Sequence, residues 1–379
     1  MIKADMLIKN GCVIDTYNHV HGKRDIAVYK GKIADPALFP ESEQTIDAEG
    51  CIVCPGLIEY HAHIAVPCCE MAVDPNLISF GTGVTTIVDA GSTGTASYEY
   101  FKKYTEYVPV RIKAMLNVAP EGLATVRHPE NADPAFWNRD RIFELFEKYG
   151  NDLVGLKVRS DIRCLNGMGI GPLIEAIKLA DKIGCPVICH TTNPPIPMEV
   201  LVGYFRPGDV FTHVYHNTGY TILDENGELK PQFRIAQNRG VLLDASNGYK
   251  NFSNTVAQKA ISSGLLPDII STDVIRKSAF ADSGNVVSLP FVMSKYLGFG
   301  LSVDSVIRAV TETPAKSIGM LDSIGTLDVG TIADISILRV IDKDVEFRDL
   351  DGTSFKGQKL IKPEMTIKDG QIMYRQIDF

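Results

Sequence analysis

PGLIEYHAHI, residues 55–64, is the stretch that decides the fold of this chain. It is an apolar run that follows a Pro-Gly pair and ends with two histidines, His61 and His63. Side chains two positions apart on a β-strand point to the same face. We therefore expect both imidazoles to project together from the C-terminal end of a buried strand.

Seven further apolar runs follow, and between them lie segments with apolar residues at helical spacing, such as RDRIFELFEKYG (139–150) and PLIEAIKLADKIG (172–184). Together with 56–63, the strand-like runs are 85–91, 110–118, 153–160, 185–191, 209–215, 240–246 and 267–273. Strands that alternate with helices in this way predict an α/β protein, namely a (β/α)8 TIM-type barrel, here over residues 55–324.

The two chain ends have a different pattern, with short strand-like runs and Gly-containing turns. MLIKNGCVID (6–15) and DIAVYKGKIA (25–34) each predict a hairpin, because Asn-Gly and Lys-Gly are turn signals. Similar runs return near the C-terminus. We predict that residues 1–54 and 325–379 together form one small β-sandwich domain, into which the barrel is inserted.

Composition narrows the classes of function. The 379 residues carry a formal net charge of −8 and no Lys/Arg-rich run, so the basic face that a nucleic-acid partner requires is not expected. No stretch approaches the roughly 20 apolar residues that span a bilayer, and MIKADMLIKN (1–10) has no signal-peptide core. We expect a cytoplasmic homo-oligomer that acts on a small-molecule substrate and binds neither nucleic acid nor membrane.

Polar residues occur where several of the strand-like runs end, which is where catalytic side chains lie in a parallel barrel. A lone histidine at such a place is usually only hydrogen-bonded, and an HxH pair is a weak signal. The whole set favours a metal site, since neutral imidazole and carboxylate are ordinary zinc ligands. The candidate ligands are His61, His63, Lys157, His190, His213 and Asp273.

Lys157 is the unusual member, because a lysine within an apolar strand is costly unless it is paired or modified. It could be a snorkelling side chain or part of an ion pair. Burial and nearby cations would instead lower its pKa and favour the free amine. A free amine can react with CO₂ to form a carbamate, a carboxylate on a long arm that can bridge two metal ions.

These residues resemble the amidohydrolase superfamily. PGLIEYHAH is similar to the first-strand pattern of that superfamily, and GVTTIVDAGS (83–92), TPAKSIG (313–319) and IGTLDVGTIADISIL (324–338) also resemble it. The resemblance implies a hydrolase with two divalent ions, here taken to be Zn²⁺. It implies that His61, His63 and Asp273 bind the buried ion, that His190 and His213 bind the exposed one, and that carboxylated Lys157 bridges them.

The subgroup within the superfamily is indicated by one residue that departs from the dihydroorotase pattern. Dihydroorotases usually carry an arginine two residues after HxH, and Ala65 stands there in this chain. The segments GVTTIVDAGS and LKVRSD (156–161) are more similar to dihydroorotase-like deacetylases. Glu121, just past the third strand-like run, is interpreted as a loop residue rather than as a ligand.

We therefore expect an amide or ester of a small carboxylate-bearing substrate to be hydrolysed by a metal-bridging hydroxide, with Asp273 moving the proton. The alternatives are a cyclic amidohydrolase of dihydroorotase or hydantoinase type, a nucleobase deaminase, and an inactive scaffold. Arg159, two residues after Lys157 on the same strand face, is predicted to bind the substrate carboxylate. An ion pair with Asp161 or a loop carboxylate is the alternative for Arg159.

Overall fold

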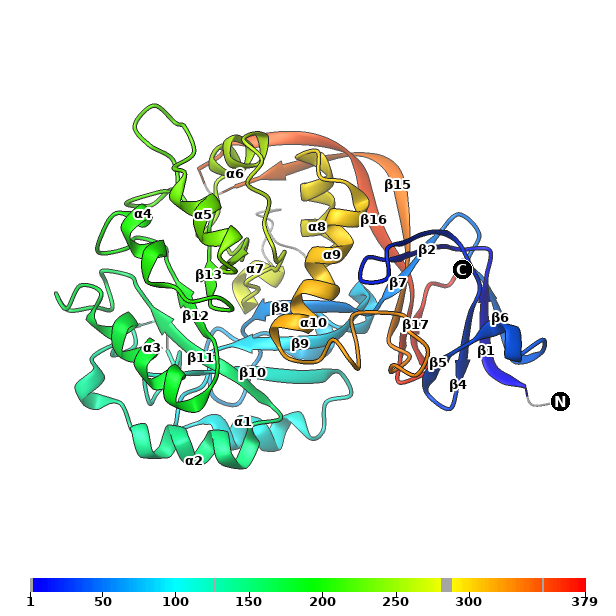
Figure 1. The fold of residues 1–379 in the computed structure, drawn as a ribbon, viewed down its shortest axis with the longest axis horizontal. Helices are drawn as coiled ribbons and strands as arrows, with labels where there is room; N and C mark the ends of the chain where they lie inside the picture. Colours follow the sequence, from blue (N-terminus) through cyan, green and yellow to red (C-terminus); the bar gives the residue numbers. More distant parts are fainter. Residues whose placement is uncertain (1–2, 126, 281–287, 350) are drawn as a thin grey trace.

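The computed structural model describes residues 3–125, 127–280, 288–349 and 351–379. A seven-stranded sheet forms the wall of a barrel, and every neighbouring pair of strands in it is parallel (Figure 1). In sheet order the strands are β8 (Leu57–Ala62), β9 (Val84–Ala90), β10 (Arg111–Asn117), β11 (Leu153–Arg159), β12 (Val187–His190), β13 (Val210–Thr212) and β14 (Leu242–Asp244).

The eighth position of the barrel is filled by an extended segment and not by a regular strand. Isolated parallel bridges join Ile269 to Asp244 and Val274 to Ala62, so this segment closes the ring between β14 and β8. The backbone of Asp273 has a φ of 48°, in the left-handed region. That conformation interrupts the extended geometry that a strand over 267–273 requires. The predicted barrel is confirmed, while its eighth strand is reduced to two bridges.

Helices lie outside the sheet, as the helical spacing predicts (Figure 1). They are α1 (Tyr98–Thr105), α2 (Arg139–Tyr149), α3 (Gly171–Ile183), α4 (Met198–Leu201), α5 (Gln232–Asn238), α6 (Asn254–Ser262), α7 (Arg276–Phe280), α8 (Leu289–Gly298), α9 (Val303–Val310) and α10 (Glu312–Ser317). Short 3-10 turns lie at Pro36–Leu38, Pro75–Leu77, Phe80–Thr82, Pro134–Phe136 and Val202–Tyr204.

α3 illustrates why these segments become helices. Pro172 occupies its first turn, where a missing N–H costs nothing. Gly184 ends it in the left-handed conformation and donates its N–H to the carbonyl of Ala180. The apolar side of α3, including Leu173 and Leu179, is buried against the barrel.

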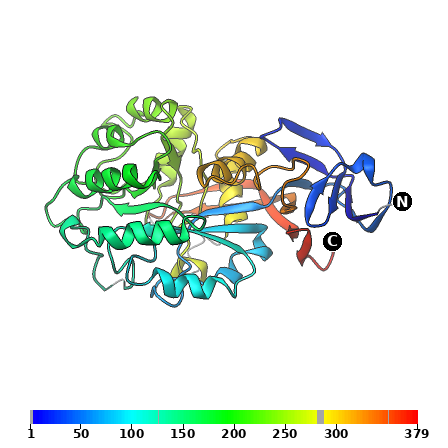
Figure 2. The ribbon, with the colours of Figure 1, turned by 60° about the horizontal axis from the view of Figure 1, so that its bottom comes forward.

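Two sheets at the other end of the molecule combine both chain termini (Figure 2). The first has the order β5-β4-β1-β6, and the second has the order β17-β16-β15-β7-β2-β3. The strands are β1 (Ala4–Lys9), β2 (Cys12–Asp15), β3 (Val20–Lys23), β4 (Ile26–Tyr29), β5 (Lys32–Ala34), β6 (Ser42–Asp47), β7 (Ile52–Pro55), β15 (Ile335–Arg348), β16 (Ser354–Lys368) and β17 (Gln371–Arg375).

Apolar side chains from both sheets pack in one cluster, for example Met6 and Val28 from the first sheet with Val13 and Ile337 from the second. The β-sandwich that the sequence predicts is therefore present. Strands from the N-terminal and C-terminal parts of the chain pair directly, with Ile335 of β15 opposite Pro55 of β7. The domain boundaries at residues 54/55 and 324/325 stay a prediction.

One predicted hairpin is confirmed and the other is wrong. Residues 25–34 form a hairpin, in which Ala27 pairs with Ala34. Residues 6–15 do not, because β1 pairs with β4 and β6, whereas β2 pairs with β3 and β7. At Gly11 the chain crosses from one sheet to the other, and a Cβ there would lie 2.5 Å from Val53 Cγ2. Packing between the two sheets thus overrides the local turn signal.

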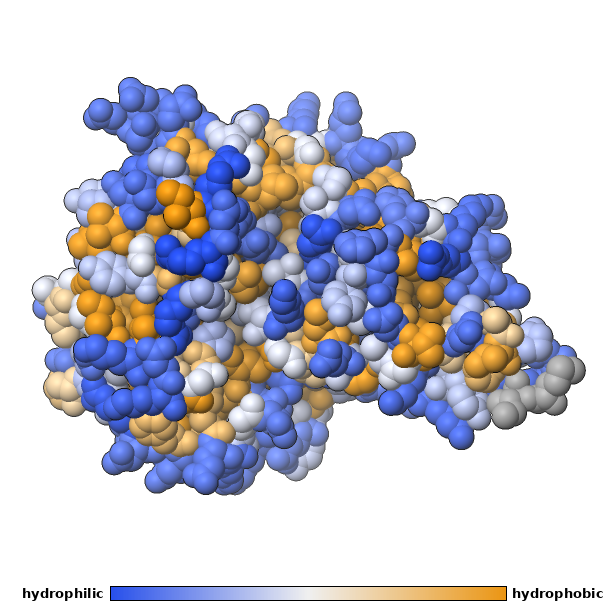
Figure 3. Space-filling model, viewed as in Figure 1, coloured by the Kyte–Doolittle hydropathy of each residue, from blue (hydrophilic) through white to orange (hydrophobic). Residues whose placement is uncertain are grey.

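β15 and β16 form a long hairpin that reaches from the terminal sheets over the barrel (Figure 1). The N–H of Ile361 in β16 donates to Ser294 Oγ of α8 at 2.8 Å, and Asp349 near the hairpin tip accepts from the N–H of Asn254 at 2.7 Å. The face in Figure 3 carries interspersed hydrophilic and hydrophobic residues. Within the described ranges, no helix combines the length and the apolar character needed to cross a membrane.

Candidate active site

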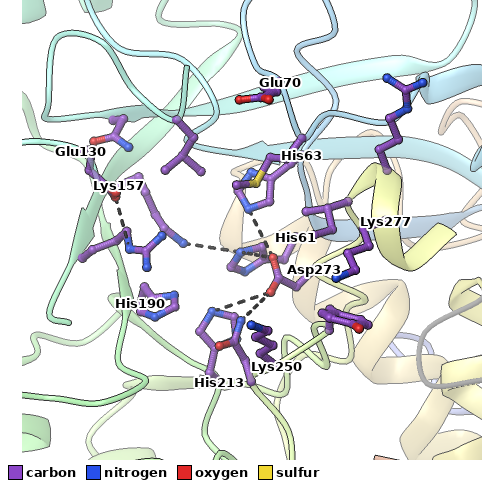
Figure 4. Close-up of a pocket in the computed structure, with 18 of the residues that line it drawn as sticks. His61, His63, Glu70, Glu130, Lys157, His190, His213, Lys250, Asp273 and Lys277 are labelled. Carbon is purple, nitrogen blue, oxygen red and sulfur yellow. Dashed lines mark hydrogen bonds and ion pairs between the residues drawn. The ribbon is translucent and has the colours of Figure 1, made fainter. Parts of the chain in front are cut away.

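A cavity of about 1040 Å³ opens at the C-terminal ends of the barrel strands. It contains every ligand candidate from the sequence (Figure 4). These are His61, His63, Lys157, His190, His213 and Asp273. The side chains come from five barrel positions far apart in the sequence, so it is the closure of the barrel that brings them together.

His61, His63 and Asp273 form the tightest part of the site, because their ligand atoms all lie within 4.8 Å of one another. Asp273 Oδ1 is 3.2 Å from His63 Nε2 and 3.6 Å from His61 Nε2. The backbone N–H of Asp273 also donates to the carbonyl of His61 at 2.7 Å. The same bond that closes the barrel therefore sets the carboxylate beside both imidazoles.

The remaining candidates lie on the other side of the same carboxylate. Asp273 Oδ2 is 4.0 Å from His213 Nε2, and the rings of His213 and His190 are 4.5 Å apart between centroids. Lys157 reaches toward the first group, with its Nζ 3.5 Å from His61 Nε2. Asp273 thus lies between the His61–His63 pair and the His190–His213 pair (Figure 4).

Hydrogen bonds behind two of the imidazoles fix their orientation. His213 Nδ1 donates to the carbonyl of Ser246 at 2.8 Å, since a carbonyl can only accept. His61 Nδ1 is 2.9 Å from Ser246 Oγ and 3.2 Å from Asp244 Oδ2. With Nδ1 engaged in this way, Nε2 of each ring presents its lone pair to the cavity. Such outer partners are typical of metal-binding histidines.

His63 is held through a relay on β9. Its Nδ1 is 2.9 Å from Ser92 Oγ, and that hydroxyl donates to Asp89 Oδ2 at 2.7 Å. Asp89 also accepts from the N–H of Ile64 at 3.0 Å. These hydrogen bonds hold the end of β8 against the end of β9. The His63 ring cannot rotate away from Asp273 without breaking them.

Burial favours the neutral state of the imidazoles, and the surrounding groups favour the ionised state of the carboxylate, which are the protonation states that bind metal. It lowers the pKa of His61 and His190 well below the usual value, and that of His213 to about 3, so these imidazoles are neutral. Burial opposes ionisation of Asp273, but the hydrogen bond with His63 and the electrostatic effect of the His61, His213 and His63 imidazoles together outweigh it and lower the pKa of the carboxyl group. Burial also lowers the pKa of the Lys157 amine to about 8.

These residues fit a divalent-metal centre. Neutral imidazoles and a carboxylate converge on one point, and their outer atoms are already bonded. His190 Nε2 is buried, and the part of the chain that the structure describes offers it no hydrogen-bond partner. Its nearest carboxylate oxygen, Asp161 Oδ2, is 3.8 Å away.

Comparison with known proteins agrees with this geometry. The sequence profile of the Amidohydrolase family matches residues 52–373. This chain belongs to the amidohydrolase family. It is 34% identical over 330 residues to a deacetylase of Agrobacterium fabrum, a match that covers 86% of this chain and 80% of the relative.

Two solved structures share the fold of this amidohydrolase almost completely. An adenine deaminase matches with a TM-score of 0.90 at 26% identity, over 99% of this chain and 100% of the other. A dihydroorotase matches with a TM-score of 0.88 at 32% identity, over 99% and 98%. The protein is a hydrolase that acts on C–N bonds, and its family generally uses divalent metals.

Arg159 lines the cavity of this amidohydrolase on the same strand face as Lys157, as the period of two predicts. Its Nε is 3.3 Å from Glu130 Oε1 and its Nη2 is 3.3 Å from Asp161 Oδ2. The guanidinium thus makes ion pairs with Asp161 and with a second carboxylate, which was the alternative to substrate binding for Arg159. It also lines the cavity. Carboxylate binding by Arg159 stays a prediction.

Glu121, which the sequence predicts to be a loop residue, and the histidine His216 both lie outside the ligand set. Glu121 does not line the cavity and accepts a hydrogen bond from the N–H of Asn131 at 2.7 Å, as expected of a loop residue. His216 is buried near His213, and its Nδ1 accepts from the N–H of Thr218 at 3.2 Å. Both therefore support the loops around the site.

Several cavity residues were not predicted from the sequence, and most of them lie in the loops after the strands. Asn251 Nδ2 donates to Asp273 Oδ2 at 2.9 Å and fixes the outer oxygen of that carboxylate. Others that line the cavity include Glu70, Asn117, Glu130, Arg163, Tyr249, Lys250, Arg276 and Lys277. For most of them a position in the loop after a predicted strand was a usable signal, but no sequence period tells which loop side chains turn inward.

Proposed function

We propose that this amidohydrolase is a binuclear metal-dependent deacylase, which removes an acetyl or similar acyl group from an amide or ester of a small carboxylate-bearing substrate. The observation that carries the proposal is the convergence of four imidazoles, one carboxylate and one buried lysine at the strand ends. The 34% identity to a protein named a deacetylase supports the reaction class. A homo-oligomeric state stays a prediction.

The proposed ligand assignment follows the two histidine pairs. His61, His63 and Asp273 would hold one ion, taken to be Zn²⁺, and His190 and His213 would hold the other. Burial lowers the pKa of the Lys157 amine to about 8. This amine would react with CO₂ to give a carbamate that could bind both ions. When bound, the ions would acidify the attacking water and polarise the scissile carbonyl.

Asp273 is proposed to move the proton. Its Oδ1 faces His63 and is suited to metal binding, whereas its Oδ2 is held by Asn251 at 2.9 Å. In the proposed reaction Oδ2 takes a proton from the attacking water and returns it to the leaving nitrogen or oxygen. The products are a carboxylate and an amine or alcohol.

The proposal is tested by comparing released products across substrate classes. We expect purified, metal-replete enzyme to release carboxylate from acylated amino acids or acylated hydroxy acids. Cyclic amides test the dihydroorotase and hydantoinase alternative, and purines and pyrimidines test the deaminase alternative. Ammonia release from a nucleobase, with no hydrolysis of any acylated acid, would show that the proposed reaction is wrong.

Arg159→Met tests the substrate carboxylate. An arginine fork binds a carboxylate through paired charge-assisted hydrogen bonds. We expect kcat/KM for an acylated acid to fall by about 2 kcal/mol more, roughly 30-fold, than kcat/KM for its carboxamide analogue. Arg159→Lys keeps the charge next to Glu130 and Asp161 and should lose less. Equal losses for acid and carboxamide would assign Arg159 a purely structural role.

A further inference from the structure

The cavity wall opposite Arg159 carries a second set of basic side chains, Lys250, Arg276 and Lys277, which we call the distal basic group. Lys250 follows β14, and the other two follow the eighth barrel segment at the start of α7. β11 is the fourth barrel position and therefore faces the eighth across the ring. Figure 4 shows Lys277 on the other side of the site from Lys157.

Among the described residues, this group has no counterpart to the carboxylates that neutralise Arg159. Arg159 lies 3.3 Å from carboxylate oxygens of both Glu130 and Asp161. Within residues 3–125, 127–280, 288–349 and 351–379, no carboxylate lies at ion-pair distance from the distal basic group. Glu70 also lines the cavity, but three cations outnumber this one carboxylate and create a local positive field that attracts anions.

The segments that present these cations are held in place by the fold. The backbone N–H of Arg276 donates to the carbonyl of Met71 at 2.7 Å. Lys277 Nζ lies 4.7 Å from the centre of the Tyr249 ring, a cation–π contact that ties α7 to the loop after β14. Ser278 Oγ accepts from the N–H of Ile275 at 3.0 Å and fixes the turn between them.

The cavity also has room beyond the reacting group. Its volume of about 1040 Å³ is at the upper end of the roughly 300–1,000 Å³ of sites that hold drug-sized ligands. A small acylated acid with its carboxylate at Arg159 leaves space on the side of the distal basic group. The charged side chains around that space are the three cations of the distal basic group and the single carboxylate of Glu70, so the matching ligand chemistry is an anion.

We infer that the substrate carries a second anionic group, a carboxylate or a phosphate, which the distal basic group binds across the site from Arg159. The inference rests on the proposed deacylase function and narrows it. The substrate class is an acylated amino or hydroxy acid whose side chain ends in an acid. Lysine and arginine nitrogens would donate charge-assisted hydrogen bonds to its oxygens.

Matched substrate pairs test this selectivity. We expect kcat/KM to be at least about tenfold higher for N-acetylglutamate than for N-acetylglutamine, or for N-acetylphosphoserine than for N-acetylserine. The pair with the larger ratio identifies a carboxylate or a phosphate as the second anion. Lys277→Met and Lys250→Met should each lower that ratio, whereas Lys259→Met, on α6 outside the cavity, should leave it unchanged. Ratios near one in the unmodified enzyme would overturn the inference.

Binding without turnover separates this inference from the proposed function. Calorimetry should show that glutarate binds at least about tenfold more tightly than its monoamide, and that Lys277→Met removes the difference. If no acylated acid is hydrolysed but this difference persists, the anion site stands and the deacylase proposal fails. If acylated acids are hydrolysed but glutarate and its monoamide bind equally, the anion site is wrong and the deacylase proposal stands.

Discussion

Lys157→Ala is expected to lower kcat/KM on the order of 10³-fold, because it removes the group proposed to serve both metal ions. Losing an outer hydrogen-bond partner of a metal ligand typically costs about 10- to 100-fold, and losing the shared ligand itself should cost more. Lys157 is 2% exposed and its Nζ is 3.5 Å from His61 Nε2. Steady-state kinetics on an acylated acid measures the loss.

Chemical rescue distinguishes a carbamate from a simple lysine. A short-chain carboxylic acid such as propionate should enter the space left by Lys157→Ala and partly restore activity. Lys113→Met is the matched control, since Lys113 lies on the adjacent strand β10 and donates to the carbonyl of Asn151 outside the cavity. Full activity in unrescued Lys157→Ala would contradict the carbamate proposal.

Asp273→Asn is expected to lower kcat by at least about 10³-fold, since a positioned general base alone contributes about 10²- to 10⁴-fold. The amide cannot take the proton from the attacking water, and it is a weaker ligand beside His61 and His63. Asn251, which donates to Oδ2 at 2.9 Å, would then face either a second donor or an uncharged carbonyl. The measurement is kcat at saturating substrate and fixed metal content.

Asp268→Asn provides the control for Asp273→Asn. Asp268 begins the same barrel segment at its opposite end and accepts from the N–H of Leu243 at 2.9 Å. Its replacement should lower Tm while kcat is kept, because no part of Asp268 lines the cavity. A similar fall in kcat for both variants would mean that Asp273 acts through the stability of the barrel and not as a base.

The barrel could be predicted because its strands are buried on both faces and appear as continuous apolar runs. Seven of the eight runs became strands, whereas the eighth forms only two isolated bridges and ends at Asp273, whose φ is 48°. Asp273 is also the residue whose carboxylate faces both His61 and His63. The false hairpin at 6–15 had a different cause, since packing of Gly11 against Val53 is a long-range contact that no turn signal contains.

The ligand candidates could be named from the sequence because the histidines and Asp273 stand at or near the ends of apolar runs, and because a lysine inside such a run, Lys157, is unusual. The same signal was available for Asp89 and Asp244, which also end buried runs, and the structure places both behind the histidines. Lys250, Arg276 and Lys277 lie a few residues beyond such runs, and nothing in the sequence indicates that their side chains turn into the cavity. Their direction depends on loop conformation, which tertiary contacts such as the Arg276–Met71 hydrogen bond determine.

Metal content tests the central claim most directly. The account predicts two divalent ions per chain in protein prepared with Zn²⁺ and bicarbonate, and fewer in Lys157→Ala prepared in the same way. Elemental analysis against protein concentration measures this ratio without any assumption about the substrate. Two equivalents in the unmodified protein would agree with the binuclear centre, and at most one equivalent in fully loaded protein would contradict it.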